Sequence, residues 1–152
     1  MKITPSQLNK FTMIKLPSAW LCGVRVVKID DKNCVTSVKH RWINQNPFNS
    51  IFWAVQGMAA ELSTGAIVIG KIREEKKKIS MLVANNKASF TKKAKGKITF
   101  ICEDGHLIDQ AIEKTMATGE GQTFWMKSIG KDEMGDIVST FHFEWTVKVK
   151  PG

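Results

Sequence analysis

The most informative residue for chemistry is Glu61, the only charged side chain between Pro47 and Gly70, in the most apolar stretch of the chain. A carboxylate in an apolar helix is costly to bury unless it finds a partner or its pKa shifts. The residues at helical spacing around Glu61 are small, namely Ser50, Ala54, Gly57 and Gly65. Another backbone or a ligand could approach this face closely, which makes Glu61 the strongest candidate for a functional residue.

Length and composition indicate one globular domain, residues 1–152, because 152 residues with 43% hydrophobic content can bury a sizeable core. The formal net charge of +9 favours anionic partners such as phosphates, cofactors or nucleic acid, without choosing between them. The three cysteines are widely spaced and match no metal or redox motif, so we expect free thiols in a reducing cytoplasm. They are Cys22, Cys34 and Cys102.

The long apolar stretch could span a bilayer, and Lys71 and Arg73 follow it like a cytoplasmic flank. Four polar residues would then lie at membrane depth, which is costly. These are Gln56, Glu61, Ser63 and Thr64. The N-terminal apolar run is also too short for a signal peptide. We therefore expect a buried helix in a cytoplasmic protein and no membrane partner.

The pattern of apolar residues predicts a short N-terminal helix and a loop closed by Pro17 within residues 5–20, followed by a hairpin of strands over 23–29 and 33–41. The long central helix should begin with Asn46 as its cap and Pro47 at the first helical position. Its apolar stripe, which should face the sheet, consists of Phe48, Phe52, Val55, Ala59, Leu62 and Ala66. Glu61 lies on a different face.

After the central helix, the sequence predicts strands over 79–90 and 97–102, an amphipathic helix over 104–118 and a closing hairpin of strands over 122–129 and 137–149. In the last strand Phe141, Phe143 and Trp145 alternate with polar residues, which is typical of a half-buried strand. The order of elements indicates a single α+β domain with an antiparallel sheet.

A curved antiparallel sheet wrapped around a long central helix is the hot-dog fold, and this order of elements resembles it. The helix region resembles acyl-CoA thioesterases of the phenylacetate-pathway type. Those enzymes have an Asn in a loop, His-Gly-Gly six residues later, and a catalytic acid nine residues beyond the His. Here Asn46 matches the Asn, Glu61 matches the acid, and Phe52-Trp53-Ala54 stands in place of His-Gly-Gly. The segment from Asn46 to Gly65 most resembles a thioesterase-like branch known as a domain of unknown function.

The resemblance implies hydrolysis of an acyl thioester of coenzyme A or of a carrier protein, with coenzyme A as part of the substrate and no separate cofactor. It also implies a homodimer whose two protomers share the pocket. Two such dimers could pair to form a tetramer. Glu61 would act as general base or nucleophile, Gln56 would orient the water or the thioester, and the Trp53 N–H would polarise the carbonyl. Because His-Gly-Gly is replaced, a non-catalytic acyl or acyl-CoA binding module is the alternative.

Lysines gather around the bend at Gly96, where members of the superfamily often meet the nucleotide end of coenzyme A. The candidates for holding its phosphates are Lys92, Lys93 and Lys95. A solvated strand edge, which lysines protect from aggregation, explains the same residues, and the sequence favours it. The run from Lys76 to Lys78 is typical of a solvated turn.

Other motifs are weaker. Gly65 to Lys71 resembles the start of a phosphate-binding loop, but Ile72 replaces the required Ser or Thr. The histidines are unclustered, so no metal site is expected, and no Gly-x-Ser-x-Gly motif indicates a serine hydrolase. A nucleic-acid-binding domain would depend on charge alone, because no basic face interleaved with aromatic residues is evident.

Overall fold

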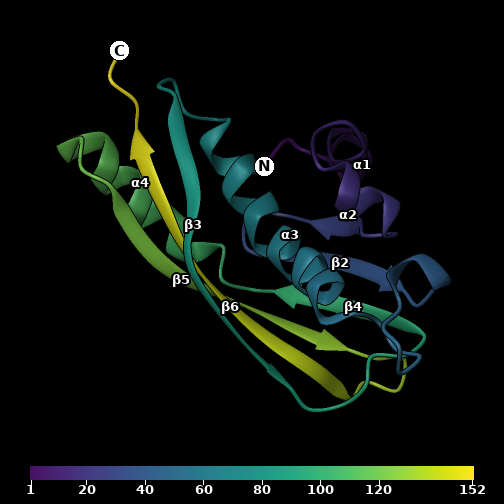
Figure 1. Cartoon of the computed structure of the whole chain (residues 1–152). Coiled ribbons are helices and arrows are strands. Elements are labelled where there is room, and N and C mark those ends of the chain that lie inside the picture. The colour runs from purple at the N-terminus through teal and green to yellow at the C-terminus, as the bar shows by residue number, and fades with distance from the viewer.

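The computed structural model describes residues 1–152 and has a six-stranded sheet that curves around the long helix α3, Trp53–Ile72 (Figure 1). Every strand pairing is antiparallel, and the strand order is β1-β2-β4-β5-β6-β3. The strands are β1 Arg25–Ile29, β2 Cys34–Lys39, β3 Ile79–Phe90, β4 Lys97–Cys102, β5 Gln122–Lys131 and β6 Ile137–Val149. The chain therefore has the predicted hot-dog fold. None of its helices has the length and apolar character needed to cross a membrane.

Two helices precede the sheet, α1, Pro5–Lys15, and α2, Pro17–Leu21, so a second short helix follows the predicted one where only a loop was expected. The break falls at Leu16, whose φ of −132° and ψ of 58° are not helical. Pro17 disfavours a helical conformation at the residue before it, which explains why α1 ends there and a new helix begins at Pro17. A reciprocal pair of hydrogen bonds between Thr4 and Gln7 caps the start of α1.

The central helix begins at Trp53 and not at Pro47, so the predicted cap at Asn46 is wrong. The Asn46 side chain instead organises the preceding loop. Its Oδ1 accepts hydrogen bonds from Phe48 N (2.9 Å) and Ser50 N (3.3 Å), and its Nδ2 donates to Ser50 Oγ (2.9 Å). Such local side-chain bonds offer the backbone an alternative to the helix, which delays the helix by six residues.

The core lies between α3 and the concave face of the sheet. Four of the six residues in the predicted stripe are buried there: Val55, Ala59, Leu62 and Ala66. Phe48 and Phe52 are 71% and 44% exposed, because they precede the helix rather than lie on it. On β6 the aromatic residues of the predicted alternation, Phe141, Phe143 and Trp145, are buried as expected.

Four buried side-chain hydrogen bonds tie α3 to the sheet, and they are called here the sheet-to-helix bonds. They join Thr36 Oγ1 to Ala59 O (2.7 Å), Ser128 Oγ to Ser63 Oγ (2.7 Å), Ser139 Oγ to Gln56 Oε1 (2.8 Å) and Trp145 Nε1 to Thr64 Oγ1 (2.9 Å). They satisfy polar groups that would otherwise be buried without partners.

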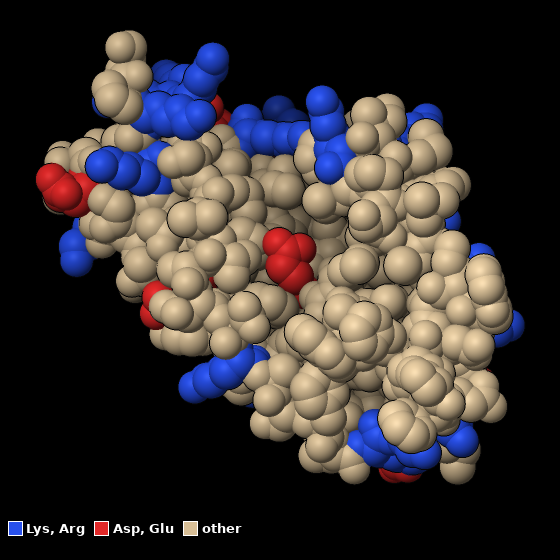
Figure 2. Space-filling model, viewed as in Figure 1, with Lys and Arg blue, Asp and Glu red and all other residues tan.

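Strand β3 lies at an edge of the sheet and pairs only with β6. Helix α3 packs against the other five strands, whereas β3 packs chiefly against β6. From Ala84 to Phe90 the strand is exposed on both faces. Figure 2 shows a recess on the face of the molecule where α3 and β3 lie in Figure 1, and this recess is called here the trough.

Helix α4, His106–Thr118, covers one end of the sheet and buries Ile108, Ala111 and Ile112. It starts two residues later than predicted and ends at Gly119, whose φ of +75° is the left-handed conformation that glycine adopts at helix ends. The α3 residue Lys71 forms an ion pair with Asp109 of α4 and so joins the two helices.

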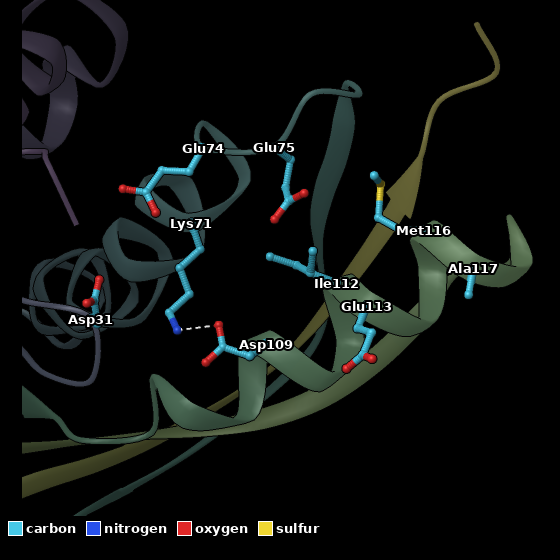
Figure 3. A pocket seen from close by; sticks show the side chains of 9 residues that line it. All are labelled: Asp31, Lys71, Glu74, Glu75, Asp109, Ile112, Glu113, Met116 and Ala117. Carbon is cyan, nitrogen blue, oxygen red and sulfur yellow. Dashed lines mark hydrogen bonds and ion pairs between the residues drawn. The ribbon is translucent and has the colours of Figure 1, made fainter.

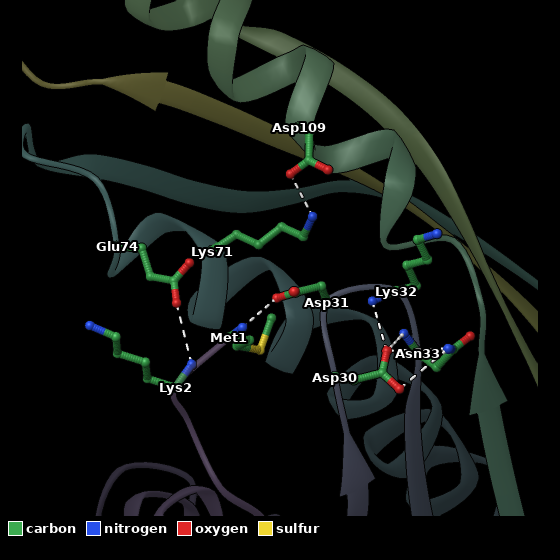
Figure 4. A network of polar contacts seen from close by, with 9 residues as sticks. All are labelled: Met1, Lys2, Asp30, Asp31, Lys32, Asn33, Lys71, Glu74 and Asp109. Atoms are coloured by element: carbon green, nitrogen blue, oxygen red, sulfur yellow. Dashed lines mark hydrogen bonds and ion pairs between the residues drawn. The ribbon is translucent and has the colours of Figure 1, made fainter.

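The predicted hairpin turn between β1 and β2 is confirmed (Figure 4). Asp30 Oδ1 accepts hydrogen bonds from Lys32 N (2.9 Å) and Asn33 N (2.8 Å), and these bonds hold the pKa of the Asp30 carboxyl below its usual range. In the same network the Met1 amino group lies 2.7 Å from Asp31 Oδ1.

All three cysteines are free, as expected. The sequence did not reveal that Cys34 of β2 lies directly opposite Cys102 of β4. Both thiols are buried in the core, and burial raises the pKa of Cys34 and raises that of Cys102 to about 12. The two thiols therefore remain protonated at neutral pH and act as small apolar residues.

Candidate functional site

Glu61 lies on the third turn of α3, and its carboxylate makes no hydrogen bond or ion pair with another residue of the chain. Burial raises the pKa of Glu61 from its ordinary value of 4.5 to about 7. The Glu61 side chain is nevertheless partly exposed, so a ligand can reach it from solvent. Glu61 is the only acidic residue of α3. A carboxyl group with a near-neutral pKa is well suited to accept a proton at pH 7.

Gly65 and Trp145 form the surroundings of this carboxylate. A Cβ on Gly65 would lie 3.0 Å from Trp145 Cζ2 and 3.5 Å from Glu61 Oε1. The glycine therefore lets the indole ring lie against the helix one turn from Glu61. The indole also bonds to the Thr64 hydroxyl, which in turn donates to the Glu61 carbonyl oxygen (2.9 Å). Strand β6 thus fixes the backbone that carries the acid.

The first turn of α3 presents two backbone donors without partners. Phe52, the N-cap residue, makes no capping bond through its side chain, and the Trp53 and Ala54 N–H groups make no hydrogen bond within the chain. Free N–H groups at a helix N-terminus favour negative charge. The predicted oxyanion donor, the Trp53 N–H, is therefore without a partner in the chain, and the Ala54 N–H is a second donor that the sequence does not reveal.

The Gln56 and Asn46 side chains are both engaged in hydrogen bonds within the protein. Gln56 is 4% exposed; its Oε1 accepts from Ser139 and its Nε2 donates to Ile51 O (3.2 Å). The Asn46 amide is used inside its own loop. Contact of either side chain with a substrate stays a prediction. Gln56 has a structural role in joining α3 to β6, and Asn46 has one in shaping the loop before α3.

A groove of about 690 Å³ opens in front of the start of α3. Its walls combine aromatic rings with polar and basic groups. They include Asn46, Phe48, Phe52, Trp53, Gln56, Phe90, Lys92 and Lys93. Glu61 is not part of this lining, because it lies eight residues further along α3, roughly 12 Å at the helical rise. One chain therefore brings together most of the predicted site residues but leaves the acid apart from them.

The three candidate lysines differ in what their charges do. Lys92 Nζ lies 2.7 Å from Asp132 Oδ2 and 2.8 Å from Asp136 Oδ2, and these bonds raise its pKa to about 12. Lys93 Nζ lies 5.8 Å from the centre of the Phe48 ring, and Lys95 is exposed outside the groove. Only Lys93 therefore presents an uncompensated charge at the groove.

A second hollow, of about 760 Å³, lies between the end of α3 and α4 (Figure 3). Its lining includes the carboxylates of Asp31, Glu74, Glu75, Asp109 and Glu113. Lys71 also lines it and is paired with Asp109. No group of three or more His, Cys, Asp or Glu side chains in the chain is arranged to hold a metal ion.

Comparison with known proteins identifies the family and supports the fold. Residues 4–147 match the model of a family described as a domain of unknown function, DUF4442. A Pseudomonas aeruginosa protein of unknown function, described as a probable thioesterase, is similar over 97% of both chains, with a TM-score of 0.81 and 17% identity. No curated protein matches the sequence.

Two further structural relatives are thioesterases. One from Haemophilus influenzae is 13% identical, with a TM-score of 0.74 over 98% of this chain and 93% of its own. One from Staphylococcus aureus has variant structures that cover 84% of this chain and 94% or 93% of their own, with TM-scores of 0.65 and 0.63 and identities of 15% and 17%. One variant replaces a glutamate by alanine, and the other replaces a glutamine fifteen positions earlier.

Proposed function

The chain belongs to the DUF4442 family, and on that premise we propose that it hydrolyses an acyl thioester such as an acyl-CoA, with Glu61 as general base or nucleophile. The observation that carries the proposal is the Glu61 carboxylate, which has no partner within the chain, is partly exposed, and has its pKa raised by burial to about 7. An unpaired, desolvated acid on a thioesterase-like fold is costly to keep unless it has a chemical use.

In the proposed reaction the Glu61 carboxylate takes a proton from water, and the resulting hydroxide attacks the acyl carbon of the thioester. The oxygen of the tetrahedral intermediate accepts hydrogen bonds from backbone N–H groups such as those of Trp53 and Ala54. The carbon–sulfur bond then breaks, and the thiolate leaves with the proton that Glu61 holds. As a nucleophile, Glu61 would instead form an anhydride that water hydrolyses.

The base and the oxyanion donors must converge within about 3 Å of one thioester, whereas Glu61 lies roughly 12 Å along the helix from Trp53. We therefore propose that two copies of the chain share the site, each supplying Glu61 to the other's helix start. The free edge of β3 suits antiparallel pairing with the same strand of a second copy. Such pairing would form a homodimer and cover the trough.

The spacing of polar residues supports the assignment. The glutamine and glutamate replaced in the Staphylococcus aureus thioesterase stand fifteen positions apart. Asn46 and Glu61 have the same separation here. We therefore propose that Asn46 contributes to the same site as Glu61. Its amide also donates a hydrogen bond to Ser50 and so holds the loop.

The direct test is a thiol-release assay over a panel of acyl-CoAs with the wild type and Glu61→Gln. We expect the Gln variant to lose hydrolysis while it still binds the substrate, because its side chain keeps the shape but cannot accept the proton. A wild type that binds acyl-CoA saturably and releases no thiol would overturn the proposal.

That second outcome would support a non-catalytic acyl-CoA binding module. The specific observation in its favour is that neither amide of the groove, Gln56 or Asn46, is free of structural hydrogen bonds, and that no histidine stands at the start of α3.

A shared site is tested by mixing two inactive variants. Glu61→Gln lacks the base, and Trp53→Pro lacks one oxyanion N–H at the first helical position, where proline is tolerated. A mixed dimer contains one complete shared site, so refolding the two together should restore roughly a quarter of the wild-type activity if each variant occurs equally. No recovery in dimers shown by light scattering would place the whole site within one chain.

A further inference from the structure

Five lysines from two distant segments meet at one end of the molecule. The loop before β3 and the end of β6 are joined by a hydrogen bond from Lys150 N to Lys78 O (2.8 Å) and by the pairing of Ile79 with Val149. The lysines line a hollow of about 860 Å³ and are called here the lysine patch. They are Lys76, Lys77, Lys78, Lys148 and Lys150.

The charge of the lysine patch is not neutralised within the chain. None of its members forms an ion pair, and no acidic residue lines the hollow. Glu74 and Glu75 directly precede Lys76, but they line the separate acidic hollow near α4 (Figure 3). Basic side chains gather along the top of Figure 2, where the C-terminus and the start of β3 lie in Figure 1. Such a concentration of one sign of charge attracts an anionic partner.

The lysine patch lies at one end of the trough that leads to Glu61. Val83 of β3 pairs with Trp145, and Trp145 lies beside Gly65 and the Glu61 carboxylate. Val83 is five residues after Lys78, which corresponds to roughly 17 Å along the strand. Figure 2 shows the recess running from its acidic atoms toward the basic side chains at the top. A partner bound to the patch can therefore reach the acid with a long, thin group.

The residue types in the lysine patch favour an acidic protein surface over a nucleotide as the anionic partner. Val149 is its only hydrophobic lining residue, and no aromatic ring is present on which the adenine of a nucleotide could stack. All five lysines are exposed and come from two segments, so their charges are spread over a broad surface. A broad set of flexible ammonium groups complements an acidic protein surface, where charge pairs steer the encounter and fix the orientation.

We propose that the lysine patch docks an acidic carrier protein that holds the acyl group as a thioester on a phosphopantetheine arm, which lies along the trough toward Glu61. This inference rests on the proposed thioester hydrolysis and names the physiological carrier of the substrate. The acidic hollow beside the patch repels the carboxylates of the carrier and limits the orientations in which it docks.

The test compares one acyl chain presented on a holo acyl carrier protein and on coenzyme A. A triple charge reversal of Lys78, Lys148 and Lys150 to Glu should lower kcat/KM for the acyl-carrier protein about tenfold or more and change kcat/KM for the acyl-CoA less than about twofold. The matched control reverses three exposed lysines on α1 and β1, Lys10, Lys15 and Lys28, and should change neither value more than about twofold. Urea denaturation confirms that both variants fold.

Binding of the holo carrier protein to Glu61→Gln, measured by calorimetry at low and high salt, provides a readout that needs no hydrolysis. We expect the affinity to fall with salt and to disappear when the patch is reversed in the same background. If acyl-CoA is hydrolysed while the carrier does not bind, the docking inference fails and the proposed function stands. If the carrier binds through the patch and no thioester is cut, the proposed function fails and the docking stands.

Two other outcomes would also overturn the inference. An equal loss of acyl-CoA hydrolysis in the triple variant would show that the lysine patch holds the phosphates of coenzyme A. Patch-dependent binding to vesicles of anionic lipid or to an unrelated oligonucleotide, with no binding of the carrier protein, would assign the surface to another class of partner.

Discussion

The Trp145 indole donates a hydrogen bond of 2.9 Å to the Thr64 hydroxyl, which itself donates to the Glu61 carbonyl oxygen. This relay connects the middle of β6 to the backbone of the candidate catalytic residue. Because the relay is buried, the position of Glu61 depends on Trp145, which lies 84 residues later in the sequence on β6, the last strand along the chain.

Replacing Thr64 by Val keeps the shape of the side chain and removes its hydroxyl. We expect the free energy of unfolding to fall by about 1–3 kcal/mol, because the indole N–H is then buried without an acceptor. Urea denaturation measures the change. Thr64→Ser keeps the hydroxyl and serves as the control, so an equally destabilised Ser variant would show that methyl packing, rather than the hydrogen bond, is responsible.

Gly65 and Gly57 lie on the same helix and provide a matched pair of Gly→Ala substitutions. A Cβ at position 65 would lie 3.0 Å from the Trp145 ring, whereas a Cβ at position 57 would make ordinary contact with Phe141 at 3.5 Å. We expect Gly65→Ala to destabilise by about 1–3 kcal/mol through overpacking. Gly57→Ala should be neutral or stabilise by up to about 1 kcal/mol through helix propensity. Thermal unfolding of both variants decides, and a stabilised Gly65→Ala would contradict the packing described here.

The pKa of Glu61 makes stability depend on pH. The folded protein holds the proton up to about pH 7, whereas the unfolded chain releases it near 4.5. Between these values the folded state binds more protons, so stability falls as pH rises through this window. The full loss is about 3 kcal/mol at most, reached above pH 7. Urea midpoints of the wild type should therefore decline relative to those of Glu61→Gln across the window; parallel curves would show that the pKa is not raised.

The same pKa shift predicts the pH dependence of hydrolysis. A general base must be deprotonated to act, so kcat/KM of the free enzyme should rise with pH and level off above an apparent pKa of about 7. A pH series of thiol release measures this limb with one acyl-CoA. A rate that levels off already near pH 5 would mean that another group, or a Glu61 with an ordinary pKa, limits the reaction.

Removing either partner of the ion pair between Lys71 and Asp109 should lower the free energy of unfolding by a different amount. The Lys71 side chain is 9% exposed and that of Asp109 is 65% exposed. Asp109→Ala leaves a buried ammonium group without its partner and should cost about 3 kcal/mol or more, whereas Lys71→Met removes the buried charge and should cost less. Unfolding by urea at neutral pH compares the two variants; a larger cost for Lys71→Met would indicate that the pair itself, not the buried charge, dominates.

The strands were the part of the fold most readable from the sequence. The strand-like segments 79–90 and 97–102 are predicted with their observed ends, because a lysine-rich bend at Gly96 separates them. Gly96 has a φ of +69°, a conformation that favours glycine. The start of α3 was mispredicted because Asn46 and Pro47 have the composition of a helix cap. Asn49, at a φ of +59°, shows that the same composition builds a loop instead.

For the site, the sequence singles out Glu61 as the one charge in an apolar stretch, but it cannot show how far the acid lies from the other candidates. The sequence predicts that Gln56 orients the substrate or water because its structural partner, Ser139, is 83 residues away in the chain. The lysine patch was missed for the same reason, since Lys78 and Lys150 become neighbours only through strand pairing. Local patterns carry no information about such contacts.

The sheet-to-helix bonds have a consequence for substrate choice. They come from β2, β5 and β6 and reach α3 between Gln56 and Thr64. A helix held at four points over more than two turns cannot roll or slide without breaking a buried hydrogen bond. The helical wall of the trough is therefore held in place, and room for a bulkier acyl group must come from smaller side chains on β3. We expect chain-length preference to follow the size of side chains such as Val83, as activity profiles of Val83→Ala and Val83→Phe would show.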